Sequence, residues 1–264
     1  MLGAAFRRSE LLSASVAPST IAATDVTVRF REIVALDQVS MSLTDGVTAL
    51  LGENGAGKTT LLRVLARLQR PEAGELRLGG TPVEGRRAEI AYRGGVGYLP
   101  QQVPTLRHLN VGQYLEYAGF LKGLPWRTVP AQVSRVLDLV DLGDQRHRRT
   151  AALSGGMVRR LGMAVAALGE PRVLLLDEPT VGLDPVQRIE LRALVQRCAE
   201  LAPVLLSTHL SEDVSAVADR VVVLHRGRVA FDDTLAELVG HGQAPGPGAN
   251  LIERGFLAVV GGLG

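Results

Sequence analysis

The segment Gly52-Glu53-Asn54-Gly55-Ala56-Gly57-Lys58-Thr59-Thr60 decides the fold of this chain. It fits the pattern G-x-x-x-x-G-K-[ST], follows the apolar run 47–51 and precedes a second apolar run at 61–65. A strand, a glycine-rich loop and a helix in this order form a phosphate-binding loop, whose backbone N–H groups and helix N-terminus surround an anion. A chance match is expected in about one chain per hundred of this length. The sequence therefore predicts a nucleotide-binding protein.

A second motif is the stretch Arg172-Val173-Leu174-Leu175-Leu176-Asp177-Glu178-Pro179. Apolar residues followed by an acid predict a buried strand that carries Asp177 to its carboxyl end, where an open α/β sheet binds its ligand. There Asp177 can share a Mg²⁺ ion with the Thr59 hydroxyl, while Lys58 lies between the β- and γ-phosphates. Glu178 is then the candidate general base for an attacking water. A strand that merely ends in an acidic turn is the alternative.

Composition excludes several classes of protein. The 264 residues are 46% apolar and 21% charged, with a net charge of only +2 and no long basic run, so we expect no nucleic-acid partner. The single cysteine, Cys198, excludes a disulfide framework and a cysteine-based metal site. No stretch approaches the roughly 18 apolar residues that span a bilayer. We therefore expect a cytoplasmic location unless another protein tethers the chain.

The chain divides into three parts by pattern and composition. Residues 1–20 lack the apolar core of a secretory signal and predict a disordered leader or an early start codon. Residues 21–240 form the main domain, and residues 241–264 predict a Gly/Pro/Ala-rich linker with a short amphipathic tail that docks back. In the main domain, apolar strands alternate with helices at 58–69, 186–201 and 211–218, which indicates a largely parallel sheet covered on both faces. The strands expected there are 26–30, 39–43, 47–51, 75–78, 95–99, 173–176, 204–207, 221–224 and 228–231.

Two regions depart from this alternation. The opening strands, joined by short turns, predict an antiparallel sheet before the phosphate-binding loop. Residues 104 to about 168 carry apolar side chains at helical spacing and predict a helical insertion between two strands of the main sheet. The arginines of this region are expected to lie on a solvated face. They are Arg146, Arg148, Arg149, Arg159 and Arg160.

The segment Leu153-Ser154-Gly155-Gly156-Met157 opens an apolar helix and provides a second anion-binding helix start. With it, the chain resembles the ATP-binding subunits of ABC transporters, whose signature is usually written LSGGQ. Further motifs of that family occur in the same order. Gln101 matches the Q-loop, Gly182-Leu183-Asp184 the D-loop, His209 the switch histidine, and Phe30 the aromatic residue that stacks on adenine. The resemblance covers about residues 21–240.

The resemblance implies a P-loop NTPase fold of the ABC ATPase type, in which a RecA-like α/β core carries an antiparallel β subdomain and a helical subdomain. It implies ATP and Mg as cofactors, with Gln101 joining Thr59 and Asp177 at the metal, and Gln101, Glu178, His209 and Lys58 as the catalytic set. Two subunits, as a homodimer or heterodimer, would close on ATP, with Ser154, Gly155 and Gly156 capping the nucleotide of the other subunit. Met157 replaces the signature glutamine, which puts the fine tuning of that closed dimer in question.

Alternatives remain open for single residues. The Q-loop glutamine can be Gln102 instead of Gln101. His209 can be a structural histidine, and Phe30 can be a core aromatic.

The resemblance also implies a separate membrane permease, which would hold the chain at the inner face of the cell membrane. The sequence around the motifs, at residues 98–101, 121–124 and 157–169, looks most like that of the drug- and polymer-exporter branch of the family. The alternative is a soluble ABC-type ATPase of cofactor assembly; DNA-repair and translation ATPases are disfavoured, since no coiled-coil insertion or second cassette is present. Residues 101–150 would form the surface that binds the permease. The candidate anchor residues on this surface are Tyr114, Tyr117, Phe120, Leu124 and Trp126, and we expect about a third of them to be exposed in the isolated subunit.

Overall fold

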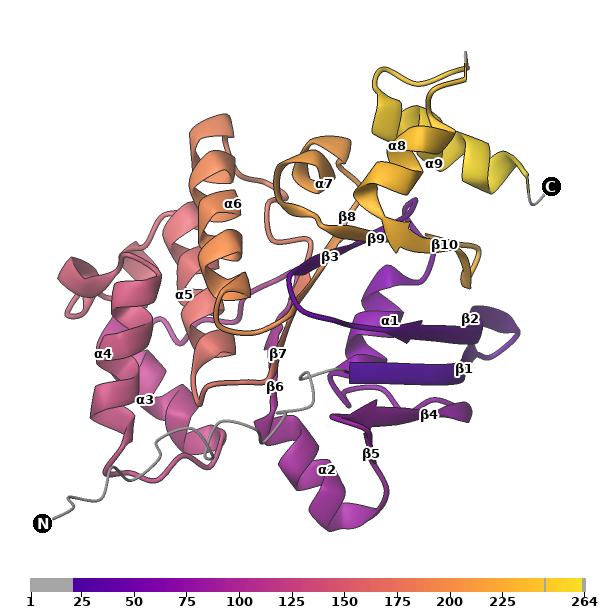
Figure 1. The fold of residues 1–264 in the computed structure, drawn as a ribbon. Coiled ribbons are helices and arrows are strands. Elements are labelled where there is room, and N and C mark those ends of the chain that lie inside the picture. The colour runs from indigo at the N-terminus through magenta and orange to yellow at the C-terminus, as the bar shows by residue number, and fades with distance from the viewer. Residues whose placement is uncertain (1–20, 245, 263–264) are drawn as a thin grey trace, which may run out of the picture.

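The structure is a computed structural model that describes residues 21–244 and 246–262. These residues form two β-sheets surrounded by helices, as Figure 1 shows. The predicted α/β class, with a largely parallel sheet and a separate antiparallel one, is confirmed. The leader predicted for residues 1–20 lies outside the described residues.

The larger sheet has six strands in the order β10-β9-β3-β8-β7-β6, and all neighbouring pairs are parallel except β10 and β9. Strands β3, β7 and β8 are buried along their whole length, because helices cover both faces of a parallel sheet. Their carboxyl ends lie at one edge, which therefore collects the segments that follow them. The strands are β3 (Val47–Leu51), β6 (Val96–Leu99), β7 (Val173–Asp177), β8 (Val204–Thr208), β9 (Arg220–His225) and β10 (Arg228–Thr234).

The smaller sheet is antiparallel in the order β2-β1-β4-β5. Its first strand begins earlier than predicted, at Ile21, because Ile21, Ala23, Val26 and Val28 all reach the core. Its strands are β1 (Ile21–Phe30), β2 (Ile33–Ser42), β4 (Ala73–Leu78) and β5 (Thr81–Pro82).

Helix α1 (Lys58–Leu65) packs in one core with strands of both sheets, through Leu61, Leu62 and Leu65. It ends at Leu65 rather than at Gln69, because Arg67 takes a left-handed φ of 55°. The amides of Leu68 and Gln69 both donate to the carbonyl of Arg63, which closes the helix end.

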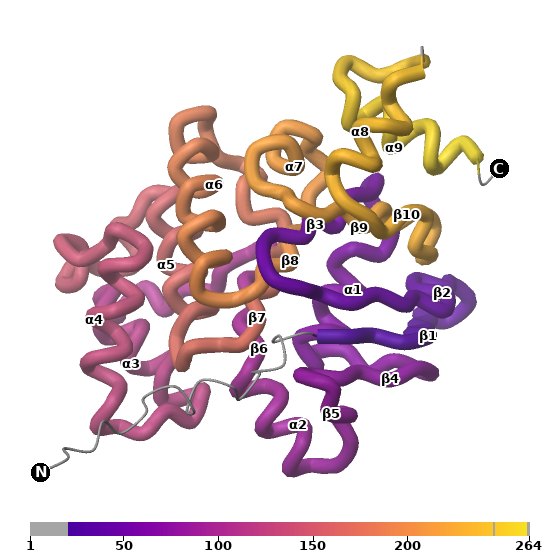
Figure 2. The backbone as a smooth tube through the Cα atoms, in the orientation of Figure 1, coloured from indigo at the N-terminus to yellow at the C-terminus, as the bar shows by residue number. Residues whose placement is uncertain are grey.

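The helical insertion lies between β6 and β7, as expected. Its three helices bury one apolar cluster against the sheet face that carries Leu99, Leu174 and Leu176. In Figure 2 these helices form the part of the molecule farthest from the antiparallel sheet. The elements are α3 (Val111–Leu121), α4 (Val129–Leu139), the short 3₁₀ turns η1 (Gly143–Gln145) and η2 (Thr150–Ala152), and α5 (Gly155–Ala167).

The remaining helices follow the strands of the core. Helices α7, α8 and α9 bury Ala49, Leu51, Val221 and Val223 on the same face of the sheet as the helical insertion, at the β3–β9 side, while α1 covers the opposite face. The tail from Leu251 forms α9, which packs beside α8. The sequence pattern missed β5, α2 and α8, which are short, and α2 buries only Tyr92. The helices are α2 (Gly85–Gly94), α6 (Pro185–Ala199), α7 (Ser211–Val217), α8 (Leu235–His241) and α9 (Leu251–Gly261).

Lys122, just after helix α3, makes a testable contribution to stability. Its Nζ donates to the carbonyl oxygens of Ala166 (3.1 Å) and Leu168 (2.9 Å), and burial lowers the pKa of Lys122 from 10.5 to about 8. Because the folded pKa is depressed, the folded state binds fewer protons than the unfolded chain between these values. The stability contribution is therefore complete above the unfolded pKa and is lost as the pH falls through about 8.

We expect the free energy of unfolding of the parent, relative to Lys122→Met, to rise by about 1 kcal/mol between about pH 7.5 and pH 10, because Lys122 is exposed as a whole residue and solvent screens part of the shift. Urea unfolding of both proteins across this range measures the difference. A constant difference would mean that the two carbonyls keep the ammonium charged in the folded state.

Candidate functional site

The phosphate-binding loop connects β3 to α1, in the context that its sequence pattern requires. Two of its glycines are required by their surroundings. A Cβ at Gly52 would lie 2.4 Å from the carbonyl oxygen of Leu224, and one at Gly57 would lie 2.5 Å from that of Ala35. Gly57 also has a φ of 105°, which only glycine adopts readily. The loop is thus held between β9 and β2, which fixes its backbone before any ligand binds.

Lys58 is buried inside this loop. Its Nζ donates to the carbonyl oxygens of Gly52 (2.7 Å) and Glu53 (3.0 Å) and lies 3.8 Å from Oε1 of Glu178. Burial lowers the pKa of Lys58, and the carboxylates of Glu178 and Asp177 oppose this shift. The ammonium therefore lies where the loop wraps an anion and beside the acidic pair at the end of β7.

Thr59 and Asp177 meet as predicted. The Thr59 hydroxyl donates to Oδ1 of Asp177 (3.1 Å), which also accepts from the Ser207 hydroxyl (2.8 Å). The Tyr98 hydroxyl donates to Oδ2 of Asp177 at 3.4 Å, and burial raises the pKa of Tyr98 to about 12. A hydroxyl beside a carboxylate is a hard-oxygen donor set that fits Mg²⁺, which takes one or two carboxylates together with substrate phosphates.

Glu178 is the centre of the site. Its carboxylate accepts from Nε2 of Gln101 (3.3 Å) and lies 3.3 Å from Nδ1 of His209, in addition to its ion pair with Lys58. Its backbone has a left-handed φ of 46°, which is unfavourable for a residue with a side chain. The amide of Glu178 donates to the hydroxyl of Ser207 at 3.0 Å, and this contact helps to hold that conformation.

A buried cluster around Asp213 supports the segment of His209. The Asp213 carboxylate accepts from the hydroxyls of Thr180 and Thr208 and from Nε of Arg192. The Thr208 hydroxyl in turn accepts from the amide of Leu210 at 3.0 Å. Asp213 therefore links the turn after β7 to the turn after β8, on which His209 lies.

One cavity of about 750 Å³ joins most of the predicted residues. Gln101, Glu178 and His209 line it together with phosphate-loop residues of the 54–60 segment. Phe30, which is half exposed, lines it beside Ile33 and Val34 at the start of β2. The cavity thus has a polar part at Lys58 and an apolar part at Phe30, as a nucleotide requires.

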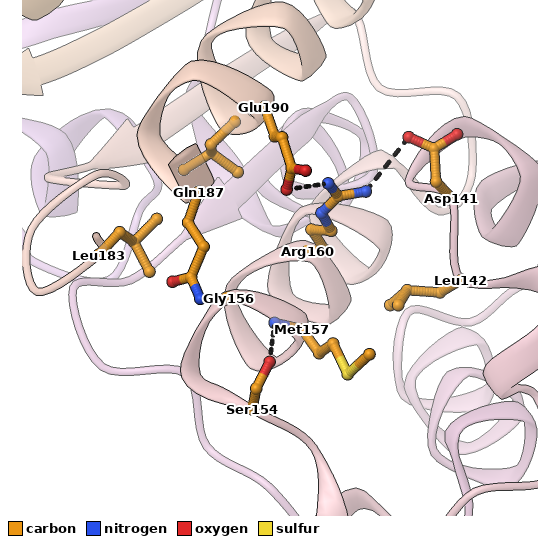
Figure 3. A pocket seen from close by; sticks show the side chains of 10 residues that line it. Asp141, Leu142, Ser154, Gly156, Met157, Arg160, Leu183, Gln187 and Glu190 are labelled. Carbon is orange, nitrogen blue, oxygen red and sulfur yellow. Dashed lines mark hydrogen bonds and ion pairs between the residues drawn. The ribbon is translucent and has the colours of Figure 1, made fainter. Parts of the chain in front are cut away.

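The signature residues lie elsewhere. Ser154 caps helix α5 by accepting from the amide of Met157 at 3.3 Å, and Gly155 and Gly156 begin that helix. Ser154, Gly156 and Met157 line a second cavity of about 260 Å³, drawn in Figure 3. The Met157 side chain packs against the helical core, beside Leu142 in Figure 3.

Asp184 also begins a helix. Its carboxylate caps α6 by accepting from the amide of Gln187 at 2.9 Å. The Gln187 side chain crosses Gly156 so closely that a Cβ there would meet its Cδ at 3.0 Å. The starts of α5 and α6 therefore contact each other at the edge of the second cavity.

The expectation of a solvated arginine face is wrong for two of its members. Arg159 is partly buried and its Nη1 donates to the carbonyl oxygens of Gln101 (2.7 Å) and Pro100 (3.2 Å). Arg160 is bound to Asp141 (3.2 Å) and Glu190 (2.7 Å), as the dashed lines of Figure 3 mark. Both side chains therefore link α5 to other segments, Arg159 to the residues after β6 and Arg160 to α6.

Sequence reasoning also missed Tyr98, Ser207 and Asp213. The signal for Ser207 was available, since it is a polar residue near the end of an apolar strand that leads to His209. The contact of Tyr98 with Asp177 depends on the pairing of β6 with β7, which no local pattern reveals. In the described residues, no group of three or more His, Cys, Asp or Glu side chains could hold a metal ion, and no helix is long and apolar enough to cross a membrane.

Known proteins are similar to this chain over most of its length. Residues 36–181 match the family described as ABC transporter. The chain is 37% identical to the uncharacterized ABC transporter ATP-binding protein YxlF of Bacillus subtilis (strain 168) over 79% of this chain and 69% of the relative. It is 40% identical to the daunorubicin resistance ATP-binding protein DrrA3 of Streptomyces coeruleorubidus, over 80% of this chain and 66% of the relative. It is also 37% identical to the sulfate/thiosulfate import ATP-binding protein CysA of Mycobacterium bovis, over 79% and 60%.

The matched part thus spans about two thirds of the length of these relatives. A solved structure described as the ATP binding subunit of an ABC transporter superposes with a TM-score of 0.77 and 25% identity, over 92% of this chain and all of that one. The predicted P-loop fold of the ABC ATPase type is confirmed. The chain therefore belongs to the ABC transporter family, as an ATP-binding subunit.

Proposed function

We propose that this subunit binds ATP with Mg²⁺, hydrolyses it through Glu178, and thereby powers a separate membrane permease. The observation that carries the proposal is the convergence of Lys58, Gln101 and His209 on the Glu178 carboxylate at the wall of one cavity. A carboxylate in this position can accept the proton of a water that attacks a phosphoryl group. The surrounding donors can stabilise the charge that develops on the phosphoryl oxygens.

Each predicted residue has a role in this scheme. The phosphates are surrounded by backbone N–H groups of the loop from Gly52 to Thr60, and Lys58 neutralises their charge. The loop also contains Glu53, Asn54, Gly55 and Ala56. Phe30 stacks on the adenine. Thr59 and Asp177 hold the metal, with Gln101 as its third protein neighbour. Mg²⁺, when bound, would act as a Lewis acid that neutralises negative charge on the phosphate oxygens.

The signature segment would serve a second subunit. Ser154, Gly155 and Gly156 begin α5, and Ser154 and Gly156 line a cavity separate from that of the phosphate-binding loop. A helix start that is removed from its own phosphate site can cap a phosphate only on another copy or a paralogous subunit. ATP would therefore join two subunits, with Asp184 at the start of α6 beside each signature segment.

We expect Ser154→Ala to lower ATP turnover at least tenfold and Met157→Gln to change it less than about threefold. The serine lies at the helix start that would face the phosphate of the second subunit, whereas the methionine side chain packs against the helical core. Steady-state hydrolysis at saturating ATP measures both. A large loss from Met157→Gln with a small one from Ser154→Ala would reverse the two assignments.

The permease would bind the exposed apolar patch of Tyr117, Phe120, Leu121 and Trp126, on α3 and the segment after it. Phe120 is 74% exposed and Trp126 is 75% exposed. Tyr114 is buried and Leu124 packs against the helical core, so these two candidate anchors serve the fold instead. Exposed aromatic side chains that lie together are typical anchors of a protein interface.

We expect Phe120→Asp and Trp126→Asp each to release the subunit from membranes, since truncating a buried aromatic anchor costs about 2 kcal/mol or more. Leu201→Asp is the matched control, because Leu201 is an exposed apolar residue outside the patch. Membrane fractionation and copurification, with partners identified by mass spectrometry, measure the release. All variants must keep the parental melting temperature and ATP affinity.

Export is the favoured direction of transport, since the relative with 40% identity is named for daunorubicin resistance. A relative at 37% identity is named for sulfate and thiosulfate import, so the identity of the copurified permease decides the direction. The subunit would then lie at the inner face of the cell membrane. If the parent copurifies with no membrane protein, an ABC-type ATPase of cofactor assembly becomes the better proposal.

A further inference from the structure

Arg159 joins the signature helix to the Gln101 segment of the same subunit. It lies on α5, two residues after Met157, and its Nη1 donates to the carbonyl oxygens of Gln101 (2.7 Å) and Pro100 (3.2 Å). Partial burial lowers the pKa of the Arg159 guanidinium, and the nearby carboxylates of Asp177 and Glu178 oppose that shift. An arginine remains charged under such conditions, so both hydrogen bonds are charge-assisted.

The same helix also contacts residues before and after Gln101 in the chain. A Cβ at Gly162 would lie 2.5 Å from Cδ1 of Leu99 and 2.7 Å from Cγ2 of Val103. Further along, a Cβ at Gly97 would lie 2.4 Å from the carbonyl oxygen of Ala166. Helix α5 therefore packs closely against the residues before and after Gln101, and Arg159 holds the carbonyls between them.

A continuous series of contacts runs from α5 to the reacting carboxylate. Arg159 holds the backbone of Gln101, and the Gln101 side chain donates to Oε2 of Glu178 at 3.3 Å. Each link is a hydrogen bond of the Gln101 segment, which itself lines the cavity. A shift of the signature helix start, which the proposed second subunit would contact, therefore displaces Gln101 relative to Glu178.

We propose that Arg159 is a positioning residue. It holds Gln101 beside Glu178, and it moves Gln101 when α5, the helix that begins after Ser154, changes its position. This inference rests on the proposed function, because it assigns to Arg159 the coupling between the two surfaces that the ATPase cycle uses. A shorter or uncharged side chain at position 159 frees the two carbonyls and lets the Gln101 segment move.

The test uses Arg159→Met and a matched control, Arg135→Met. Arg135 is also partly buried and donates to a carbonyl of α5, that of Ala167 (2.9 Å), but lies away from Gln101. We expect Arg159→Met to lower kcat by about 10- to 100-fold, as small misplacements of catalytic groups do, and Arg159→Lys to restore part of it. Arg135→Met is expected to keep the parental kcat.

A double-mutant cycle with Gln101→Ala separates positioning from general stability. If Arg159 acts through Gln101, Arg159→Met lowers kcat less than about twofold further in the Gln101→Ala protein. Equal losses in both backgrounds, or no loss from Arg159→Met alone, would overturn the proposal.

A second measurement does not depend on hydrolysis. Hydrogen exchange in peptides that cover residues 97–104 is expected to be faster in Arg159→Met and unchanged in Arg135→Met. If the parent proved unable to hydrolyse ATP, the proposed function would fail, and this exchange would still decide whether Arg159 orders the Gln101 segment. Equal exchange in parent and Arg159→Met would overturn the positioning role.

Discussion

Replacing Glu178 with glutamine is expected to lower ATP turnover by about 10²–10⁴-fold while leaving ATP affinity within about threefold of the parent. Glutamine has the same size and keeps an oxygen that can accept from Gln101, so the cavity retains its shape. It cannot accept a proton from water, and it removes the negative charge beside Lys58 and His209. The variant therefore separates binding from chemistry.

The same variant is expected to accumulate as an ATP-bound dimer, because closure would persist when hydrolysis is blocked. Size-exclusion chromatography with Mg-ATP measures the dimer, and phosphate release measures turnover. Glu237→Gln, on the exposed first turn of α8, is the control for loss of a carboxylate outside the cavity. Turnover of Glu178→Gln within twofold of the parent would exclude Glu178 as the base.

The sequence predicted which residues meet at the site because their strands obey one rule. The phosphate-binding loop, Asp177 and His209 all follow parallel strands, so their segments lie at one edge of the sheet wherever the helices between them go. Glycine positions are informative for a related reason. At Gly52 and Gly57 the backbone approaches other carbonyls within a distance that excludes a side chain.

The residues that the sequence did not predict at the site are those whose roles depend on tertiary contacts. Arg159 follows a helix pattern that equally suits a solvated face, and its burial depends on how α5 returns to β6. Asp213 is an acid on a short helix, and only the fold brings Thr180 and Arg192 to it. Such residues link segments that are far apart in the chain, so no local pattern distinguishes them from surface residues.

The contacts of Lys58 indicate how the loop holds this side chain where a phosphate would bind. Its ammonium is satisfied by the carbonyls of Gly52 and Glu53 and lies near Glu178, while burial lowers the pKa of Lys58. The side chain is thus already in the loop, and ATP would replace neutral carbonyl acceptors by charged phosphate oxygens. Both kinds of bond involve the charged ammonium and are worth about 1.5–3 kcal/mol each, and the phosphate oxygens add the attraction of opposite charges.

We therefore expect Lys58→Met to weaken Mg-ATP affinity by about 10- to 100-fold and to lower turnover at saturating ATP by at least 100-fold. Calorimetric titration measures the affinity. The melting temperature without nucleotide is expected to fall by a few degrees, because the buried Glu178 carboxylate loses its cationic partner even though methionine fills a similar volume. The rise in melting temperature that ATP causes, which depends on the ratio of its concentration to Kd, should be reduced accordingly. Parental affinity in a folded Lys58→Met protein would mean that the loop backbone alone holds the phosphates and that Lys58 serves only the structure of the loop.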